Sequence, residues 1–300
     1  MRELRAGPHT LAFGLYLAAM TAGLLAHSSW LYAGFFGGLL GLLIWFTRKS
    51  APDARAYSAI ASDAFYPIAL NLVFPAMAVA VPAIRADRFD AALFALDARY
   101  LGGSWSERLE PVIRPALTEL MSLCYLFFMP LLYASLVRYF FWQRERRASF
   151  LAGLFTIYGF GFLGYLLVPA AGPYLVFAGL FTVPLHGGPL WHLNEEMVAF
   201  GSNGVDVFPS LHAAVSAYIL GFAYRHARQE FWWLLLPVSG ICVSTIYLRY
   251  HYLIDVVCGL ALALIGLAAG LYQERRLRGA PSPGSVVSGP TSSSVFRLRP

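Results

Sequence analysis

The chain has 300 residues, of which 58% are hydrophobic and only 13% are charged. That composition excludes an ordinary soluble domain, and repeated apolar runs of about 20 residues match the roughly 30 Å hydrocarbon core of a bilayer. The formal net charge of +6 does not indicate a nucleic-acid partner, because the Arg residues lie in short loops and tails rather than on one face. We therefore expect an all-α, polytopic membrane helix bundle.

Eight apolar runs are long enough to cross a bilayer as helices. They cover residues about 10–27, 30–47, 63–84, 117–141, 149–169, 208–226, 231–249 and 252–272. The first run follows Arg2 and Arg5 and lacks a small-x-small cleavage site, so we expect a retained helix rather than a signal peptide. The three cysteines lie inside apolar runs and predict neither a disulfide nor a zinc site.

Basic residues are distributed unevenly about these spans. Eight crossings place both termini on one side, and 16 of the 22 Lys and Arg residues lie on that side. The opposite side holds the other six, Arg85, Arg88, Arg99, Arg108, Arg114 and Arg249. The positive-inside rule predicts an integral protein of the cell or inner membrane, with cytoplasmic termini and an extracytoplasmic 170–207 loop. His212 and His251, which begin the sixth and eighth spans, then share the outer side.

Three parts are expected along the chain. Residues 1–62 hold an N-terminal pair of membrane helices, and residues 63–272 hold a six-span membrane domain with the ionisable residues described below. Residues 273–300 are rich in Pro, Ser and Gly and lack apolar periodicity for most of their length, which predicts a disordered cytoplasmic tail.

The outer segment 85–116 is more than a simple linker. Its apolar side chains recur at helical spacing and are followed by two glycines, which predicts a short helix lying in the membrane interface. The residues concerned are Phe89, Leu93, Leu96, Tyr100, Gly102 and Gly103.

Pro209-Ser210-Leu211-His212 is the first of two strings with ionisable side chains at the ends of apolar runs. Ionisable groups at membrane depth are usually functional. Pro209 suits a first helical turn, and the backbone amides that follow it form a natural seat for an anion, to which the Ser210 hydroxyl adds a donor. The same string also fits an ordinary Pro-initiated helix with a capping histidine.

The second string places Arg249, His251 and Asp255 at the start of the last span. His251 and Asp255 are four residues apart and share one face of a helix, so the carboxylate can hold one imidazole nitrogen and leave the other nucleophilic. The Arg249 guanidinium can bind a phosphate through two parallel N–H bonds. The alternative is a structural His–Asp contact, with Arg249 reaching the lipid headgroups.

Together the strings resemble the second and third signature motifs of the type 2 phosphatidic acid phosphatase (PAP2) superfamily. Its second motif is Pro-Ser-x-His, which is Pro209 to His212 here. Its third is Ser-Arg, five residues, His, three residues and Asp, which here runs from Ser244-Thr245 through His251 to Asp255. The resemblance implies that His251 forms a phosphohistidine, that Asp255 orients it and that His212 protonates the leaving group. It implies a six-helix core, lipid phosphate substrates, and no metal or other cofactor.

Two departures from the family pattern stand out. Thr245 replaces the motif Arg, and we infer that Arg249 takes over the phosphate-binding charge beside Ser210 and Thr245. The first motif, Lys, six residues and Arg-Pro, is absent from the end of the fifth span, where Tyr165 to Pro173 stands instead. Arg108 and Arg114-Pro115 imitate it with five intervening residues before an earlier span, which is weak support.

These departures are similar to the inositol phosphorylceramide synthase-type branch of the superfamily. The similar stretches are Tyr247-Leu248-x-x-His251-Tyr252-x-x-Asp255, Leu96-Asp97 through Gly102-Gly103, and Glu119-Leu120-x-Ser122-Leu123-x-Tyr125. That branch moves a phospho-headgroup from a phospholipid to another lipid alcohol, whereas the wider family hydrolyses lipid phosphates. The partners implied are membrane lipids, and the sequence leaves hydrolysis or transfer, the headgroup and the oligomeric state open.

Other readings of the ionisable residues were weighed. The outer loop carries His186, His192, Glu195 and Glu196, but without a spacing that fixes metal-ligand geometry. A non-catalytic lipid or proton-coupled transporter would use the His/Asp cluster as a relay, and that predicts ionisable residues at several depths. A haem protein would use facing histidines, and then Asp255 has no role. Their clustering at one end favours the enzyme.

Overall fold

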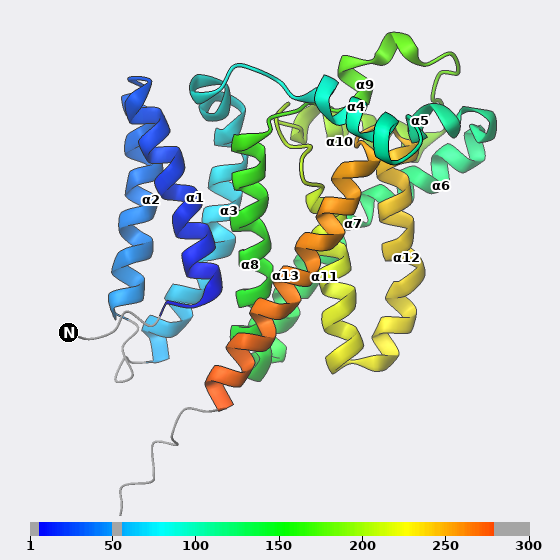
Figure 1. Cartoon of the computed structure of the whole chain (residues 1–300). Helices are drawn as coiled ribbons and strands as arrows, with labels where there is room; N and C mark the ends of the chain where they lie inside the picture. Colours follow the sequence, from blue (N-terminus) through cyan, green and yellow to red (C-terminus); the bar gives the residue numbers. More distant parts are fainter. Residues whose placement is uncertain (1–5, 50–55, 279–300) are drawn as a thin grey trace, which may run out of the picture.

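The computed structural model describes residues 6–49 and 56–278, and every regular element within them is a helix (Figure 1). Seven helices in these ranges are long and apolar enough to cross a membrane, which confirms the expected polytopic bundle. They are α1 (Pro8–Ala26), α2 (Trp30–Lys49), α3 (Ala56–Ile84), α8 (Arg144–Leu167), α12 (Arg228–Tyr247), α13 (Leu253–Arg278) and one composite span, α6 (Pro115–Leu126), α7 (Phe128–Val137) and η2 (Arg138–Trp142).

The sixth expected span forms a shorter helix, α11 (Leu211–His226), of 16 residues. At about 1.5 Å per residue it is shorter than the hydrocarbon core is thick. It contacts α7, α8, α12 and α13 and buries most of its first three turns. The chain before it, about 202–210, enters the bundle without regular structure, so the start of α11 lies inside protein rather than lipid.

The composite span is interrupted at Phe127. Pro130 lacks the N–H that would bond to the carbonyl of Leu126, and its ring crowds that carbonyl, so the helix is interrupted one turn before the proline. The helix resumes at Phe128, whose ring then contacts His212 with centroids 4.4 Å apart. The break thus shapes the wall around a candidate site residue.

The N-terminal helix α1 packs directly onto α8. A side chain at Gly159 of α8 would meet the backbone of Ala12 and Phe13 at 2.6 Å, so glycine permits the close approach. Phe13, Tyr16 and Phe162 belong to one core cluster that runs on into α11. Residues 1–62, expected as a separate part, therefore share a core with the rest of the bundle as far as they are described.

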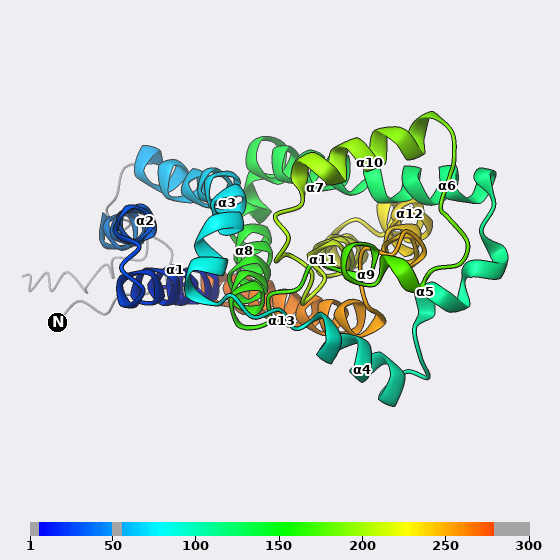
Figure 2. The same ribbon diagram turned by 90° about the horizontal axis from the view of Figure 1, so that it is seen from above.

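Short helices lie across one end of the bundle, which we call the capped end (Figures 1 and 2). They are α4 (Asp90–Tyr100), α5 (Trp105–Arg108), η1 (Glu110–Val112), α9 (Pro173–Val176), η3 (Ala178–Leu180) and α10 (Pro189–Gly201). Helix α4 confirms the short helix expected before Gly102 and Gly103, both of which have positive φ. Seen from above, α9 lies over the middle of the bundle and α10 runs along the edge formed by α6 and α7 (Figure 2).

The last span is longer than expected. Helix α13 continues to Arg278, so residues 273–278, which were expected to belong to a disordered tail, are helical. The remainder of the predicted tail, residues 279–300, lies outside the described residues.

Candidate active site

His212 stands in the first turn of α11, at the capped end of the bundle. The helix begins at Leu211, and Ser210 is its N-cap, with the hydroxyl accepting from the Ala213 N–H at 3.3 Å. The Ser210 N–H donates to the Asp255 carbonyl at 3.0 Å. This differs from the expected anion seat, because Pro209 precedes the helix and the Ser210 amide is already bonded.

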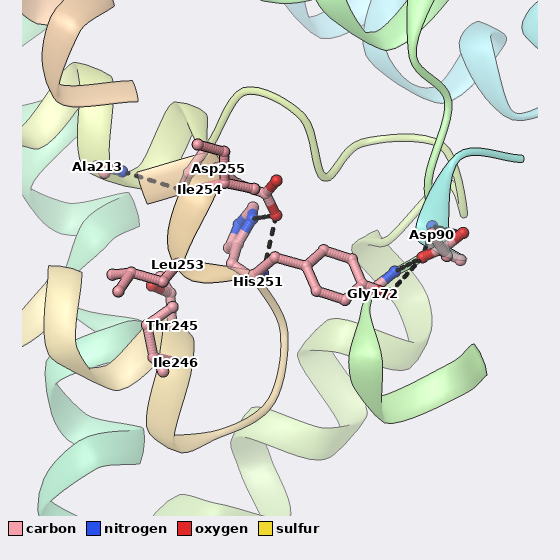
Figure 3. A network of polar contacts seen from close by, with 12 residues as sticks. Asp90, Gly172, Ala213, Thr245, Ile246, His251, Leu253, Ile254 and Asp255 are labelled. Carbon is pink, nitrogen blue, oxygen red and sulfur yellow. Dashed lines mark hydrogen bonds and ion pairs between the residues drawn. The ribbon is translucent and has the colours of Figure 1, made fainter. Parts of the chain in front are cut away.

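His251 lies in the turn between α12 and α13, with Asp255 in the first turn of α13 (Figure 3). The Nδ1 of His251 lies 3.5 Å from Oδ2 of Asp255, an ion-pair distance without hydrogen-bond geometry. The same Oδ2 accepts from the Tyr252 N–H at 2.9 Å. Both side chains are almost fully buried, and the structure therefore holds this pair together as the four-residue spacing predicted.

The backbone around His251 is held by Thr245. The Thr245 carbonyl accepts from the N–H groups of Tyr250 at 2.9 Å and His251 at 3.1 Å, while its hydroxyl donates to the Cys242 carbonyl. A side chain at Gly259 would meet the Ser210 carbonyl at 2.4 Å, so the first turns of α13 and α11 approach closely. These contacts bring the two motifs, far apart in sequence, to one place.

The two histidines face each other across this junction. Their ring centroids are 5.8 Å apart with planes inclined by 64°. Tyr125 stacks on His212 at 4.6 Å, and Phe128 covers it from α7. Two imidazoles at this separation can contact one phosphoryl group from different sides, which is the geometry that a nucleophile and a proton donor need.

A second carboxylate, on Asp206, belongs to the same surroundings and was missed by the sequence analysis. Burial lowers the pKa of His251 to about 4, against opposing effects of the Asp206 charge and the Val207 backbone. Burial likewise raises the pKa of Asp206, although hydrogen bonds and the charge of His251 act in the other direction. Its Oδ1 accepts from the Ser202 hydroxyl at 3.2 Å. His251 is therefore a neutral imidazole at neutral pH.

Arg249 adopts an unusual backbone conformation, with φ of +65°. Its Nη2 donates to the Val183 carbonyl at 2.6 Å and lies 3.3 Å from Glu110, and its guanidinium lies over the Phe181 ring. Its Nε is buried without a hydrogen-bond partner. The structure thus brings Arg249 to the capped end and pairs it with Glu110, leaving one donor free.

Two aspartates of α4 hold the segment that follows His251. Asp97 accepts from the N–H groups of Leu253 and Ile254, both at 2.8 Å, at the start of α13. Asp90 accepts from the Gly172 N–H at 2.9 Å and from the Tyr252 hydroxyl at 2.9 Å (Figure 3). Only Asp97 had a signal in the sequence, through the Leu96-Asp97 stretch. Neither aspartate was expected to act on the candidate site.

The remaining candidates lie elsewhere on the capped end. Arg108, which imitates the missing first motif, donates to the Gly102 carbonyl, and the Arg114 backbone caps α6 beside the Tyr247 hydroxyl. His186 contacts the Pro184 carbonyl, and His192 is exposed on α10. Within residues 6–49 and 56–278, no three His, Cys, Asp or Glu side chains form a metal-binding group.

The fold and these residues define a membrane protein whose helical bundle encloses a His–His–Asp centre at one end. A model of the PAP2 superfamily matches residues 91–269, more than half of the chain. The chain therefore belongs to the PAP2 superfamily. The matched region begins in α4 and runs through α13, so α1, α2 and α3 lie outside it.

A curated relative is the phosphoinositol dihydroceramide synthase of Bacteroides thetaiotaomicron, which is 26% identical over 167 residues. The similarity covers 50% of this chain and 54% of the relative, so the chain matches about half of that protein's length. It supports the inositol phosphorylceramide synthase-like branch that the motifs indicated. No solved structure matches the chain.

Proposed function

We propose that this chain is a lipid phosphotransferase or phosphatase that cleaves a lipid phosphoester at the extracytoplasmic face through a phosphohistidine. The observation that carries the proposal is the meeting of His212, His251 and Asp255 at one end of the bundle, with the histidine rings 5.8 Å apart. Membership of the PAP2 superfamily and the named relative support the reaction class.

In the first step, Nε2 of His251 attacks phosphorus while Asp255 holds the Nδ1 side of the ring. The N–P bond forms, the bond from phosphorus to the leaving oxygen breaks, and His212 gives its proton to that oxygen. In the second step, a hydroxyl oxygen attacks phosphorus, the N–P bond breaks, and His212 takes the hydroxyl proton. The neutral state of His251 favours this role, since an imidazolium has no lone pair to offer.

Arg249 is the proposed phosphate-binding cation, assisted by Ser210 and Thr245. Its unpartnered Nε supports this role, because a buried donor without an acceptor in the protein is costly unless a ligand supplies one. The pair with Glu110 then orients the guanidinium rather than satisfying all of it. The hydroxyls of Ser210 and Thr245 are both used within the turns, so they act chiefly by shaping the backbone around the phosphate.

The catalytic unit proposed is residues 63–272, with 1–62 as an N-terminal addition. The donor is a phospholipid or lipid phosphate, and the acceptor is water or a lipid alcohol. The relative's name makes phosphatidylinositol with a ceramide the first pair to test. No metal takes part in the proposed steps, so activity should persist in EDTA and be inhibited by vanadate, which imitates a five-coordinate phosphoryl group.

The test uses purified protein in nanodiscs, given phosphatidic acid, an isoprenyl diphosphate, or phosphatidylinositol with ceramide, each labelled on phosphorus. One of these should yield product and transfer label to protein as an acid-labile phosphohistidine, and His251→Ala should abolish both. Product formation that survives His251→Ala would contradict the covalent mechanism. Proton flux into proteoliposomes without any product would favour the transporter instead.

The extracytoplasmic position of the site is tested by labelling. Cysteines introduced at Gly188, before α10, and at Gln143, between η2 and α8, should react with an impermeant thiol reagent from opposite sides. Gly188 should label from outside intact cells. Labelling of both positions from one side would contradict the proposed topology.

A further inference from the structure

Asn194 is a fully buried polar residue on the inner face of α10, outside the centre described above. Its Nδ2 donates to the Tyr250 hydroxyl at 2.8 Å, while its Oδ1 has no partner. A buried acceptor without a donor costs folding free energy, and a leucine of similar volume would avoid that cost. The amide therefore asks for an explanation other than stability.

The amide is one end of a polar chain that reaches the surface. The Tyr250 hydroxyl donates in turn to Oε1 of Glu195 at 3.1 Å, and Glu195 is exposed. One turn before Asn194, the indole Nε1 of Trp191 is also buried without a partner. A donor and an acceptor on the same side of one helix are thus both unsatisfied.

This chain of polar groups adjoins the two histidines. Tyr250 immediately precedes His251, and its ring lies 4.8 Å from that of Tyr125. Tyr125 in turn stacks on His212 at 4.6 Å. A phosphate held between the histidines would therefore have Tyr250 and α10 within the reach of its attached headgroup.

Building on the proposed phosphotransfer, we propose that Asn194, Glu195 and Tyr250 form a subsite for the hydroxyl groups of an uncharged polyol headgroup, such as an inositol ring, on the lipid donor. Hydroxyls both donate and accept hydrogen bonds, and this cluster offers an amide, a phenol and a carboxylate in one place. The unpaired Oδ1 of Asn194 and Nε1 of Trp191 are the acceptor and donor that such a ring would satisfy.

A charged headgroup fits the cluster less well. The Glu195 carboxylate repels an anionic headgroup. A quaternary ammonium needs open aromatic faces, whereas Tyr125 is stacked on His212 and packed against Tyr250. The polyol is therefore the occupant that the polar atoms and the ring packing favour together.

The kinetic test compares phosphatidylinositol, phosphatidylcholine and phosphatidic acid as donors for Asn194→Leu and Tyr250→Phe. A site built to bond hydroxyls discriminates by those bonds, so kcat/KM for phosphatidylinositol should fall at least about tenfold more than for phosphatidic acid. Glu196→Gln, the exposed neighbour on α10, is the matched control and should change neither. Equal losses on all donors, or a larger loss on phosphatidylcholine, would overturn the polyol subsite.

A binding test separates this proposal from the proposed function. Wild-type protein in nanodiscs should bind myo-inositol 1-phosphate more tightly than phosphocholine or inorganic phosphate, and Asn194→Leu should lose that preference without a lower melting temperature. If no donor is turned over but this preference appears, the reaction is wrong and the subsite stands. If the wild type binds the three probes equally, the subsite is wrong, whatever the turnover.

Discussion

The capped end and the interior of the bundle are held together by different chemistry. In the interior, α1, α8, α11 and α13 pack aromatic and aliphatic side chains, with glycines where the helices approach most closely. At the capped end, four carboxylates each accept from two consecutive backbone N–H groups of another segment. They are Asp90 on Ala171 and Gly172, Asp97 on Leu253 and Ile254, Glu110 on Thr182 and Val183, and Glu119 on Leu190 and Trp191.

The difference separates stability from positioning. Apolar packing has no preferred direction and mainly sets how stable the bundle is. A carboxylate on two backbone N–H groups fixes direction as well as distance, and each charged hydrogen bond contributes about 1.5–3 kcal/mol. All four carboxylates come from residues 90–119, so this one segment positions the 170–191 loop and the start of α13. Changes at the capped end should alter kinetics, and changes in the interior should alter stability.

The largest effect expected is at His212. Replacing it with Ala should lower kcat by about 10²–10⁴-fold for a lipid substrate, because a positioned proton donor contributes that much. An aryl phosphate has a good leaving group and should lose far less. His192→Ala, an exposed histidine on α10, is the control and should retain wild-type rates. Equal losses of His212→Ala on both substrates would show that His212 is not the proton donor.

Arg249 should come next. Arg249→Lys should lose about tenfold or more in kcat/KM, because an ammonium cannot copy the planar guanidinium. Arg99→Lys, at the exposed end of α4, is the control. Thr245→Arg with Arg249→Gly rebuilds the family motif, and glycine accepts the positive φ without strain, so the pair should recover part of the loss. Wild-type kinetics for Arg249→Ala would assign the phosphate charge elsewhere, with Arg108 or Arg114 the next candidates.

Asp97 tests the positioning role of the capped end. Asp97→Ala removes both hydrogen bonds to the start of α13 and should lower kcat/KM about tenfold by displacing Asp255 from His251. Asp87→Ala, in the exposed segment before α4, should have no effect. Measured rates for the two variants decide the matter, and unchanged kinetics for Asp97→Ala would leave that aspartate a purely structural role.

The pH profile provides a smaller effect. With the pKa of His251 lowered to about 4, kcat/KM should stay level down to about pH 5 and fall only as His251 gains a proton near pH 4. Asp206, Asp255 and His212 face the ring, and the charge of Asp206 favours the protonated form. Asp206→Asn should therefore move the acid limb to lower pH. An acid limb near pH 6.5 in the wild type would contradict a buried, neutral nucleophile.

The smallest effect on activity is expected in the interior. The Tyr218 hydroxyl donates to the Phe150 carbonyl at 2.7 Å between α11 and α8. Tyr218→Phe should lower the free energy of unfolding by about 1 kcal/mol, the net value of one such bond, and leave kcat/KM unchanged. Thermal unfolding and kinetics on the same preparation measure both. A kinetic loss without a stability loss would break the distinction between the two regions.

Much of this architecture is local and was predictable. The apolar runs predicted the helices, because a chain in lipid must satisfy its backbone within each segment. The spacing of His251 and Asp255 predicted their contact, since four residues bring side chains to one face. The interruption at Phe127 and the short length of α11 were not predicted, because the first follows from Pro130 and the second from protein surrounding the start of that helix.

The sequence by itself determined the helical membrane class, the motif residues and the short helix before Gly102. Only the tertiary structure decided that His212 meets His251, that Asp206 acts on His251, and that Arg249 pairs with Glu110. The same holds for Asn194 and Tyr250, which are 56 residues apart. The physical reason is that periodicity reports which face of a helix is buried, whereas contacts between the ends of different helices depend on how the whole bundle packs.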